Sequence, residues 1–179
     1  EEYIMVFVVL RHGESEWNKL NKFTGLTDVA LSEQGKQEAR LTGNLLKNSF
    51  FDFVFSSQLE RTIHTAKIIA DVQNNPVQLK PHNEFEERDY GDITGKNKTE
   101  LMEEHGKEQI KIWRRSFYQG PPGGENLCDV TQRVGKGYEN YIKPLLDDKK
   151  NVLLVSHGNS LRALFVHLGI KDEKTIESF

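Results

Sequence analysis

Two histidine–glycine pairs, His12–Gly13 and His157–Gly158, each follow an apolar run that ends in one polar residue. For the first pair, that polar residue is Arg11. A neutral imidazole is a competent nucleophile near neutral pH, and a guanidinium group matches the oxygens of a phosphoryl group. Because an unpaired buried cation is unfavourable, Arg11 at the end of an apolar run predicts an anion beside it. These residue types indicate phosphoryl transfer through a phosphohistidine.

Two other interpretations of the histidines compete with this one. A single histidine at the end of a strand is more often satisfied by backbone groups, and only the repeated pair together with Arg11 favours catalysis. A zinc site is a further use of paired histidines. Here the neighbouring residues are arginines rather than cysteines or several carboxylates, so we expect no metal.

The elements that must position these residues follow from the hydrophobic periodicity. Apolar runs predict strands at 4–10, 51–57 and 151–160. Helical spacing of apolar residues predicts helices at 32–47, 59–70, 127–145 and 161–168, and one or two helices over 98–117 that are broken near Gly106. Alternating strands and helices predict an α/β fold, a three-layer sandwich whose mostly parallel central sheet is flanked by helices. Ligands in such folds lie beyond the carboxyl ends of strands, where His12, Arg61 and His157 are expected to meet.

Three finer expectations concern single elements. The strand at 4–10 is expected to be buried on both faces. Ser32 is expected to cap the helix at 32–47. The apolar contacts of this helix are expected from Ala39, Leu41, Leu45 and Leu46. Ser57 and Glu60 have the spacing of a capping box at the next helix.

Composition limits the class of protein. The 179 residues suffice for one domain, 1–179, and the net charge of −3 predicts no general attraction to nucleic acid or to a membrane. Cys128 is the only cysteine, so no intramolecular disulfide can form, and a reduced, cytoplasmic setting is expected. No apolar run approaches 18 residues, and no basic region precedes the first one, so we expect neither a spanning helix nor a secretory signal.

Seven motifs occur in the order "LRHGESEWN", "FTG", "SSQLERTIHT", "EERDYG", "GKNK", "IWRRSF" and "SHGNSLRAL". Together, over 10–164, they resemble the histidine phosphatase superfamily and, within it, the short form of the cofactor-dependent phosphoglycerate mutases. The resemblance implies a phosphoglycerate mutase-like version of the α/β sandwich. Members of this family usually continue beyond the position of Phe179, so a C-terminal segment that helps to close the site is expected to be missing from 1–179.

The resemblance also implies roles for individual residues. His12 would be the nucleophile that carries the phosphoryl group, and Glu87 would be the proton donor and acceptor for the substrate hydroxyl. Asn18 would donate a hydrogen bond to the same phosphoryl group. The residues that hold this group and stabilise its transition-state charge would be Arg11, Arg61 and His157. The residues that bind the rest of the substrate would be Thr24, Gly25, Arg88, Tyr90, Lys98, Arg114, Arg115, Gly158 and Asn159.

The activity implied by the resemblance is the interconversion of 3-phosphoglycerate and 2-phosphoglycerate, a step of glycolysis and gluconeogenesis. Its primer and intermediate would be 2,3-bisphosphoglycerate, with small-molecule phosphoglycerates as partners, no metal, and homo-oligomerisation left open. The alternatives are a bisphosphoglycerate mutase or a phosphatase of the same superfamily, and a non-catalytic phosphate-binding module that would lack His12 or Glu87. Broad phosphatases usually lack "ERDYG", "GKNK" and "WRRSF", which favours the mutase.

The charges around the two reacting groups give further predictions. A ring of cations disfavours protonation of an imidazole, so His12 is predicted to be neutral at neutral pH. Glu87 lies among cations in the sequence and is expected to be ionised in the resting state. Without the motif context, Arg114–Arg115 could be a solvated helix face, and Arg61 could pair with Glu60 or Asp71.

Overall fold

The computed structural model of the protein describes residues 4–76 and 78–179. Its sheet has four strands, all of which pair in parallel in the order β1-β4-β2-β3. The strands are β1 (Phe7–Arg11), β2 (Phe53–Ser56), β3 (Leu79–Pro81) and β4 (Val152–Ser156). The predicted parallel sheet is therefore confirmed.

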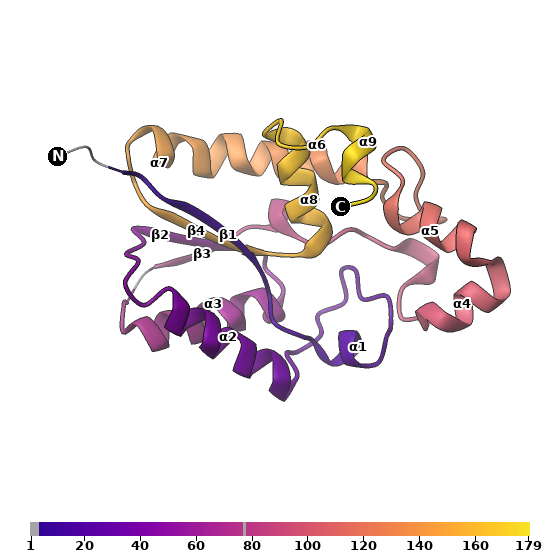
Figure 1. Cartoon of the computed structure of the whole chain (residues 1–179), viewed down its shortest axis with the longest axis horizontal. Helices are drawn as coiled ribbons and strands as arrows, with labels where there is room; N and C mark the ends of the chain where they lie inside the picture. The colour runs from indigo at the N-terminus through magenta and orange to yellow at the C-terminus, as the bar shows by residue number, and fades with distance from the viewer. Residues whose placement is uncertain (1–3, 77) are drawn as a thin grey trace.

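Helices cover both faces of the sheet (Figure 1). One face carries α2 (Glu33–Leu45) and α3 (Glu60–Gln73), and the other carries α6 (Leu127–Gly137), α7 (Lys143–Asp147) and α8 (Gly158–His167). Beyond the carboxyl ends of the strands lie α1 (Glu16–Lys19), α4 (Lys98–His105) and α5 (Lys107–Arg115), with α9 (Glu173–Ile176) beside α8 (Figure 1). This arrangement confirms the predicted three-layer sandwich. No helix among the described residues combines the length and the apolar character needed to cross a bilayer.

The centre of the sheet is β4, which is buried along its whole length. Val152 and Leu154 belong to the core cluster that contains residues of α6 and α8, whereas Leu153 and Val155 pack with residues of α3 on the opposite face. A strand that is buried on both faces consists of consecutive apolar residues, as residues 152–155 do.

The first strand differs from the prediction. It begins at Phe7 rather than at residue 4, and its residues are only half buried, with Ile4 and Met5 exposed. The physical reason is its place at the edge of the sheet, where it pairs with β4 alone among the described residues. The expectation of burial on both faces is therefore met only in part: Phe7 and Val9 pack against one core cluster and Val8 and Leu10 against the other, but none of them is fully buried.

Helix α2 is capped as predicted, and its apolar contacts are predicted correctly only in part. The side chain of Ser32 accepts a hydrogen bond from the backbone N–H of Gly35. However, Leu41 and Leu45 are 65% and 85% exposed, so the expected apolar contacts of these residues are wrong. The predicted contacts of Ala39, which is buried, and of Leu46, which packs against the core, are confirmed. Gly35 and Gly43 complete the buried face, because small residues let α3 and the loop after β1 approach the helix backbone.

The capping box predicted at α3 does not form among the described residues. Leu59 occupies the N-cap position and makes no side-chain cap, and the backbone N–H of Glu60 donates instead to the carboxylate of Asp28 at 2.7 Å. The hydroxyl of Ser57 accepts a hydrogen bond from the backbone N–H of Leu59 and contacts Nε2 of His157 at 2.8 Å. Ser57 therefore contacts His157 at the carboxyl end of the sheet and does not form the predicted capping box.

Gly35 gives a test of how the loop after β1 is held. A Cβ at this position would collide with backbone atoms of Glu14, which no side-chain rotation can relieve. We expect Gly35→Ala to lower the free energy of unfolding by about 1–3 kcal/mol, as overpacking does, although alanine is the better helix former. Urea unfolding measures this change.

The matched control is Leu45→Ala on the exposed side of the same helix. It should change the free energy of unfolding by no more than about 0.5 kcal/mol. A larger loss for Leu45→Ala than for Gly35→Ala would contradict this account of α2.

Candidate active site

The carboxyl ends of β1 and β4 bring the two predicted histidines together. The backbone N–H of His12 donates to the carbonyl oxygen of Ser156 at 3.1 Å, which continues the pairing of the two strands. The ring centroids of His12 and His157 lie 5.1 Å apart. The helix α8 begins at Gly158, so His157 is the last residue before its first turn.

One backbone hydrogen bond determines the tautomer of His12. Its Nδ1 lies 2.6 Å from the carbonyl oxygen of Gly13, and a carbonyl can only accept, so Nδ1 carries the proton. Nε2 therefore keeps its lone pair, and it makes no hydrogen bond to the part of the chain that the structure describes. Burial, and then the charge of Arg61, lower the pKa of His12 to about 3, while the Gly13 carbonyl acts in the opposite direction. His12 is neutral at neutral pH, as the sequence predicts.

Arg61 lies beside the histidines on the first turn of α3. Its Nη1 and Nη2 donate to the carbonyl oxygens of Thr27 and Gly25, each at 2.7 Å. Within residues 4–76 and 78–179 it forms no salt bridge, so the alternative of a pair with Glu60 or Asp71 was wrong. The loop at 25–27 supplies carbonyl acceptors, which orient the guanidinium without neutralising its charge.

Buried polar atoms that lack partners mark this end of the molecule. Five side-chain atoms are buried without a hydrogen-bond partner in the described part of the chain. They are Thr24 Oγ1, Arg61 Nε, His157 Nδ1, Arg162 Nε and Arg162 Nη1. Leaving a buried donor unsatisfied costs about 1–3 kcal/mol, so the three arginine N–H groups indicate a site built for a ligand rich in acceptor oxygens.

A cavity of about 320 Å³ opens at the same end of the sheet. Its wall includes eleven of the residues that the resemblance assigned: Arg11, Asn18, Thr24, Gly25, Glu87, Tyr90, Lys98, Arg114, Arg115, Gly158 and Asn159. His12, Arg61 and His157 lie deeper than this wall, and His12 is 7% exposed. The structure therefore brings the predicted residues into two adjoining layers around one space.

The wall of the cavity is strongly cationic. Among the described residues, six lysine and arginine side chains line it, against the single carboxylate of Glu87. Arg114 and Arg115 are half buried in this wall, so they are not a solvated helix face. Burial, followed by the charges of Arg114 and Arg11, lowers the pKa of Lys98 to about 8. Such a cluster is stable only when anions compensate it, which points to a ligand with more than one negative group.

Arg88 is placed differently from the expectation. Its side chain is fully buried and donates to backbone carbonyl oxygens, at 2.8 Å from Nε to Glu125 and at 2.8 Å from Nη1 to Arg114. It does not line the cavity. In this structure the three nitrogens of Arg88 are engaged by backbone carbonyls, including that of Arg114, so its expected contact with a ligand stays a prediction without support from the geometry.

Two polar wall residues are held by their neighbours. The side-chain carbonyl of Asn18 accepts from the backbone N–H of Ser15, which leaves its amide nitrogen without a partner in the described residues. The Nδ2 of Asn159 donates to the hydroxyl of Tyr90 at 2.9 Å. Both contacts fix side chains that line the cavity.

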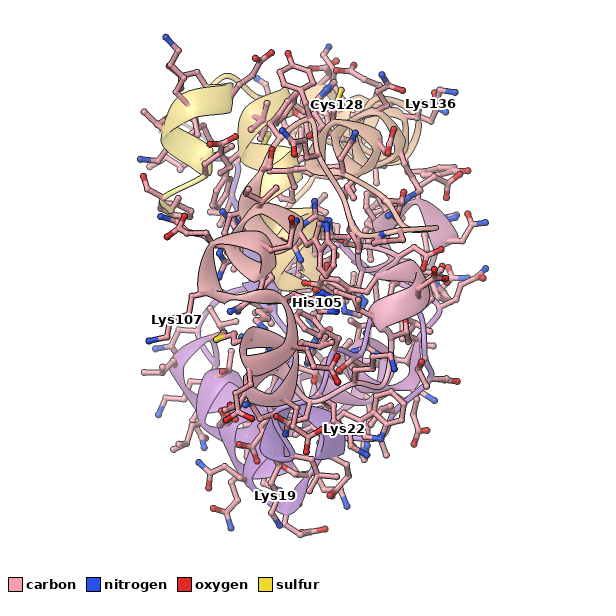
Figure 2. All side chains as sticks on the ribbon, turned by 90° about the vertical axis from the view of Figure 1, so that its right-hand side faces the viewer. Lys19, Lys22, His105, Lys107, Cys128 and Lys136 are labelled. Atoms are coloured by element: carbon pink, nitrogen blue, oxygen red, sulfur yellow. The ribbon has the colours of Figure 1, made fainter. Side chains whose placement is uncertain are left out.

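Four further wall residues were missed by the sequence analysis: Lys22, Phe23, Arg162 and Phe179. Arg162 lies three residues after Asn159 on α8, and this spacing places both on one helix face, a signal that could have found it. Figure 2 looks onto this side of the molecule, with Lys22 below His105 and with Cys128 far above both. Cys128 is not part of the cavity wall, and it packs against the core cluster that contains residues of α6 and α8.

The low pKa of His12 can be measured directly. Because burial and Arg61 hold this pKa at about 3, the imidazole signals of His12 should not shift between pH 8 and pH 5 in an NMR titration. His12→Gln assigns the signals by their loss. A titration midpoint above pH 7 would contradict the electrostatics described for the site.

Comparisons with known proteins agree on the family. Residues 7–179 match the "Histidine phosphatase superfamily (branch 1)". A 2,3-bisphosphoglycerate-dependent phosphoglycerate mutase of Cytophaga hutchinsonii is 46% identical over 163 residues, which cover 91% of this chain and 76% of the relative. A phosphoglycerate mutase of Schizosaccharomyces pombe is 45% identical over 166 residues, with 91% and 79% covered.

Among solved structures, a mycobacterial glucosyl-3-phosphoglycerate phosphatase in complex with VO3 superposes with a TM-score of 0.87. The match covers 98% of this chain and 87% of that one at 24% identity, so it shows a shared fold. The relatives with higher identity decide the family. The chain belongs to the histidine phosphatase superfamily and, within it, to the 2,3-bisphosphoglycerate-dependent phosphoglycerate mutases.

Proposed function

We propose that this protein interconverts 3-phosphoglycerate and 2-phosphoglycerate, and that the phosphoryl group passes through Nε2 of His12. One observation carries the proposal: a neutral histidine with a free lone pair adjoins a cavity lined by six cations. The names of the relatives support the same reaction. We further propose that the protein acts on these small molecules in the cytoplasm, where glycolysis and gluconeogenesis use them.

In the proposed mechanism, His12 and its neighbours form the layer that handles the transferring group. Once His12 is loaded, its N–P bond breaks as the phosphoryl group passes from Nε2 to the free hydroxyl of the bound monophosphoglycerate. The bisphosphate would then reorient, and its other phosphoryl group would form a new N–P bond to Nε2 as its bond to the substrate oxygen breaks. Arg11, Arg61 Nε and His157 Nδ1 supply donors to the phosphoryl oxygens, whose charge spreads in the transition state. Glu87 takes the proton of the attacking hydroxyl and gives it back to the leaving oxygen.

The second layer distinguishes a mutase from a phosphatase. A mutase must hold the substrate so that either hydroxyl reaches His12, and it must keep water from the phosphohistidine. Lys98, Arg114 and Arg115 would bind the carboxylate and the second phosphate. We assign Arg88 to positioning, because it holds the backbone of Arg114.

The residues present fit 2,3-bisphosphoglycerate as primer. The buried nitrogens without partners and the cationic wall match a ligand with three anionic groups. When bound, this primer supplies the phosphoryl group that loads His12. The two layers of the chain would hold one phosphate each, with Asn18 and Thr24 beside the first.

Incubation with 3-phosphoglycerate tests the proposal. We expect 2-phosphoglycerate to form, faster with 2,3-bisphosphoglycerate than without it, and little free phosphate. His12→Ala should abolish the acid-labile phosphoenzyme and lower turnover by at least about a thousandfold. Cys128→Ser, at a position outside the cavity wall, should leave both unchanged. Release of phosphate without isomerised product would instead identify a phosphatase.

Lys98 predicts a pH dependence of substrate binding. With a pKa of about 8 in the free protein, Lys98 loses its charge as the pH rises above 8. The apparent affinity for 3-phosphoglycerate should therefore fall up to about tenfold between pH 7 and pH 9, because bound anion favours the charged amine. The KM measured across this range reports the change.

Lys98→Arg should remove most of this fall, since a guanidinium stays charged throughout. Lys96→Arg, at an exposed position two residues earlier, is the matched control, and its affinity for 3-phosphoglycerate should still fall between pH 7 and pH 9. An unchanged fall in Lys98→Arg would show that another group titrates.

A further inference from the structure

Arg162 is a cavity residue to which the proposed mechanism gives no role. It lies on α8, is 6% exposed, and contributes to the cavity wall. Its Nη2 donates to the carbonyl oxygen of Ile176 in α9. Its Nε and Nη1 are buried without a partner in the described residues.

A comparison with the other buried arginines shows how unusual this is. In Arg88, all three nitrogens donate to backbone carbonyls, and in Arg61 two of the three do. In Arg162, only one of the three nitrogens donates to a described residue, although the side chain is buried. A buried guanidinium with two unpaired nitrogens is costly unless a ligand supplies acceptors.

The charges near Arg162 place it in the second layer of the site. Burial and then the charge of Arg115 lower its pKa to about 10, with Arg88 acting in the same direction and Glu87 against it. The charges that act on His12 are instead those of Arg61 and Arg11. No carboxylate forms a salt bridge with Arg162 among the residues that the structure describes. An anion that binds beside Arg115 would compensate the positive charges of Arg162 and Arg115.

We propose that Arg162 binds the anionic group of the ligand that is not being transferred, and that it is a determinant of specificity for substrates with two anionic groups. This inference rests on the proposed function and deepens it. Because Arg162 also holds Ile176, and because Phe179 lines the same cavity, the bound anion is tied to the segment that follows α8.

Calorimetric titration of two ligands tests the inference. 3-Phosphoglycerate carries a phosphate and a carboxylate, whereas glycerol 3-phosphate carries the phosphate alone. Arg162→Gln, which keeps an N–H donor for Ile176, should lower the affinity for 3-phosphoglycerate by at least about tenfold, the usual size of a lost charge-assisted hydrogen bond. The affinity for glycerol 3-phosphate should change less than about threefold. An equal loss for both ligands, or no loss for 3-phosphoglycerate, would overturn the proposal.

Asp172→Ala separates binding from a structural role. The Asp172 carboxylate caps α9 through the backbone N–H groups of Lys174 and Thr175, away from the cavity wall. This variant loosens α9 and keeps Arg162. It should retain the preference for 3-phosphoglycerate, and a loss equal to that of Arg162→Gln would show that Arg162 acts only by holding α9.

Arg162→Lys decides the matter if Arg162→Gln does not fold. Lysine keeps the charge but cannot donate to both Ile176 and a ligand. We therefore expect the affinity for 3-phosphoglycerate to fall about threefold or more relative to that for glycerol 3-phosphate. Equal affinity changes for the two ligands would contradict the inference.

Failure of the proposed function would look different. A wild-type protein that prefers 3-phosphoglycerate over glycerol 3-phosphate but does not isomerise it would contradict the mutase and leave Arg162 in place.

Discussion

The hydrogen bond from Nδ1 of His12 to the carbonyl of Gly13 is the interaction on which the proposed chemistry depends. It leaves the lone pair on Nε2, and without it either nitrogen could carry the proton. The carbonyl can accept only if the backbone at residue 13 is held. Two contacts hold it: the N–H of Gly13 donates to Thr65 Oγ1 at 3.2 Å, and Gly35 of α2 lies directly against it. The helices α2 and α3 thus set the protonation of the nucleophile.

Around this histidine, the described part of the chain leaves cations without anionic partners. Arg61 is oriented by neutral carbonyls, Arg162 keeps two free nitrogens, and the cavity wall holds one carboxylate against six cations. Such an arrangement lowers the stability of the free protein, and the negative charges of a ligand restore the balance. The same charges hold the pKa of His12 low, so the electrostatics that bind the ligand also keep the nucleophile neutral.

Much of this arrangement can be predicted from local patterns. Apolar runs and helical spacing indicate the α/β sandwich, and the rule that ligands lie at the carboxyl ends of strands correctly predicts that His12, Arg61 and His157 meet there. The order of the strands cannot be predicted in this way, because long crossovers decide it. For that reason the expected burial of β1 on both faces could not take account of its place at the edge of the sheet.

The errors at single residues have the same origin. Ser57 has the spacing of a helix cap, but it contacts His157, which is 100 residues away in the chain. Whether Arg88 or Arg162 meets the ligand depends on which backbone carbonyls lie within reach, and these come from segments distant in sequence. Motifs identify the residue types of a site, whereas the tertiary structure decides which of them are free to bind.

The central claim, that Nε2 of His12 accepts the phosphoryl group, can be tested on the phosphoenzyme itself. Protein labelled with ¹⁵N in histidine, loaded with 2,3-bisphosphoglycerate and observed by ³¹P and ¹⁵N NMR, reports which ring nitrogen is bonded to phosphorus. The hydrogen bond of Nδ1 to Gly13 predicts coupling of phosphorus to Nε2 of His12 alone. Coupling to Nδ1, or to another histidine, would contradict the account.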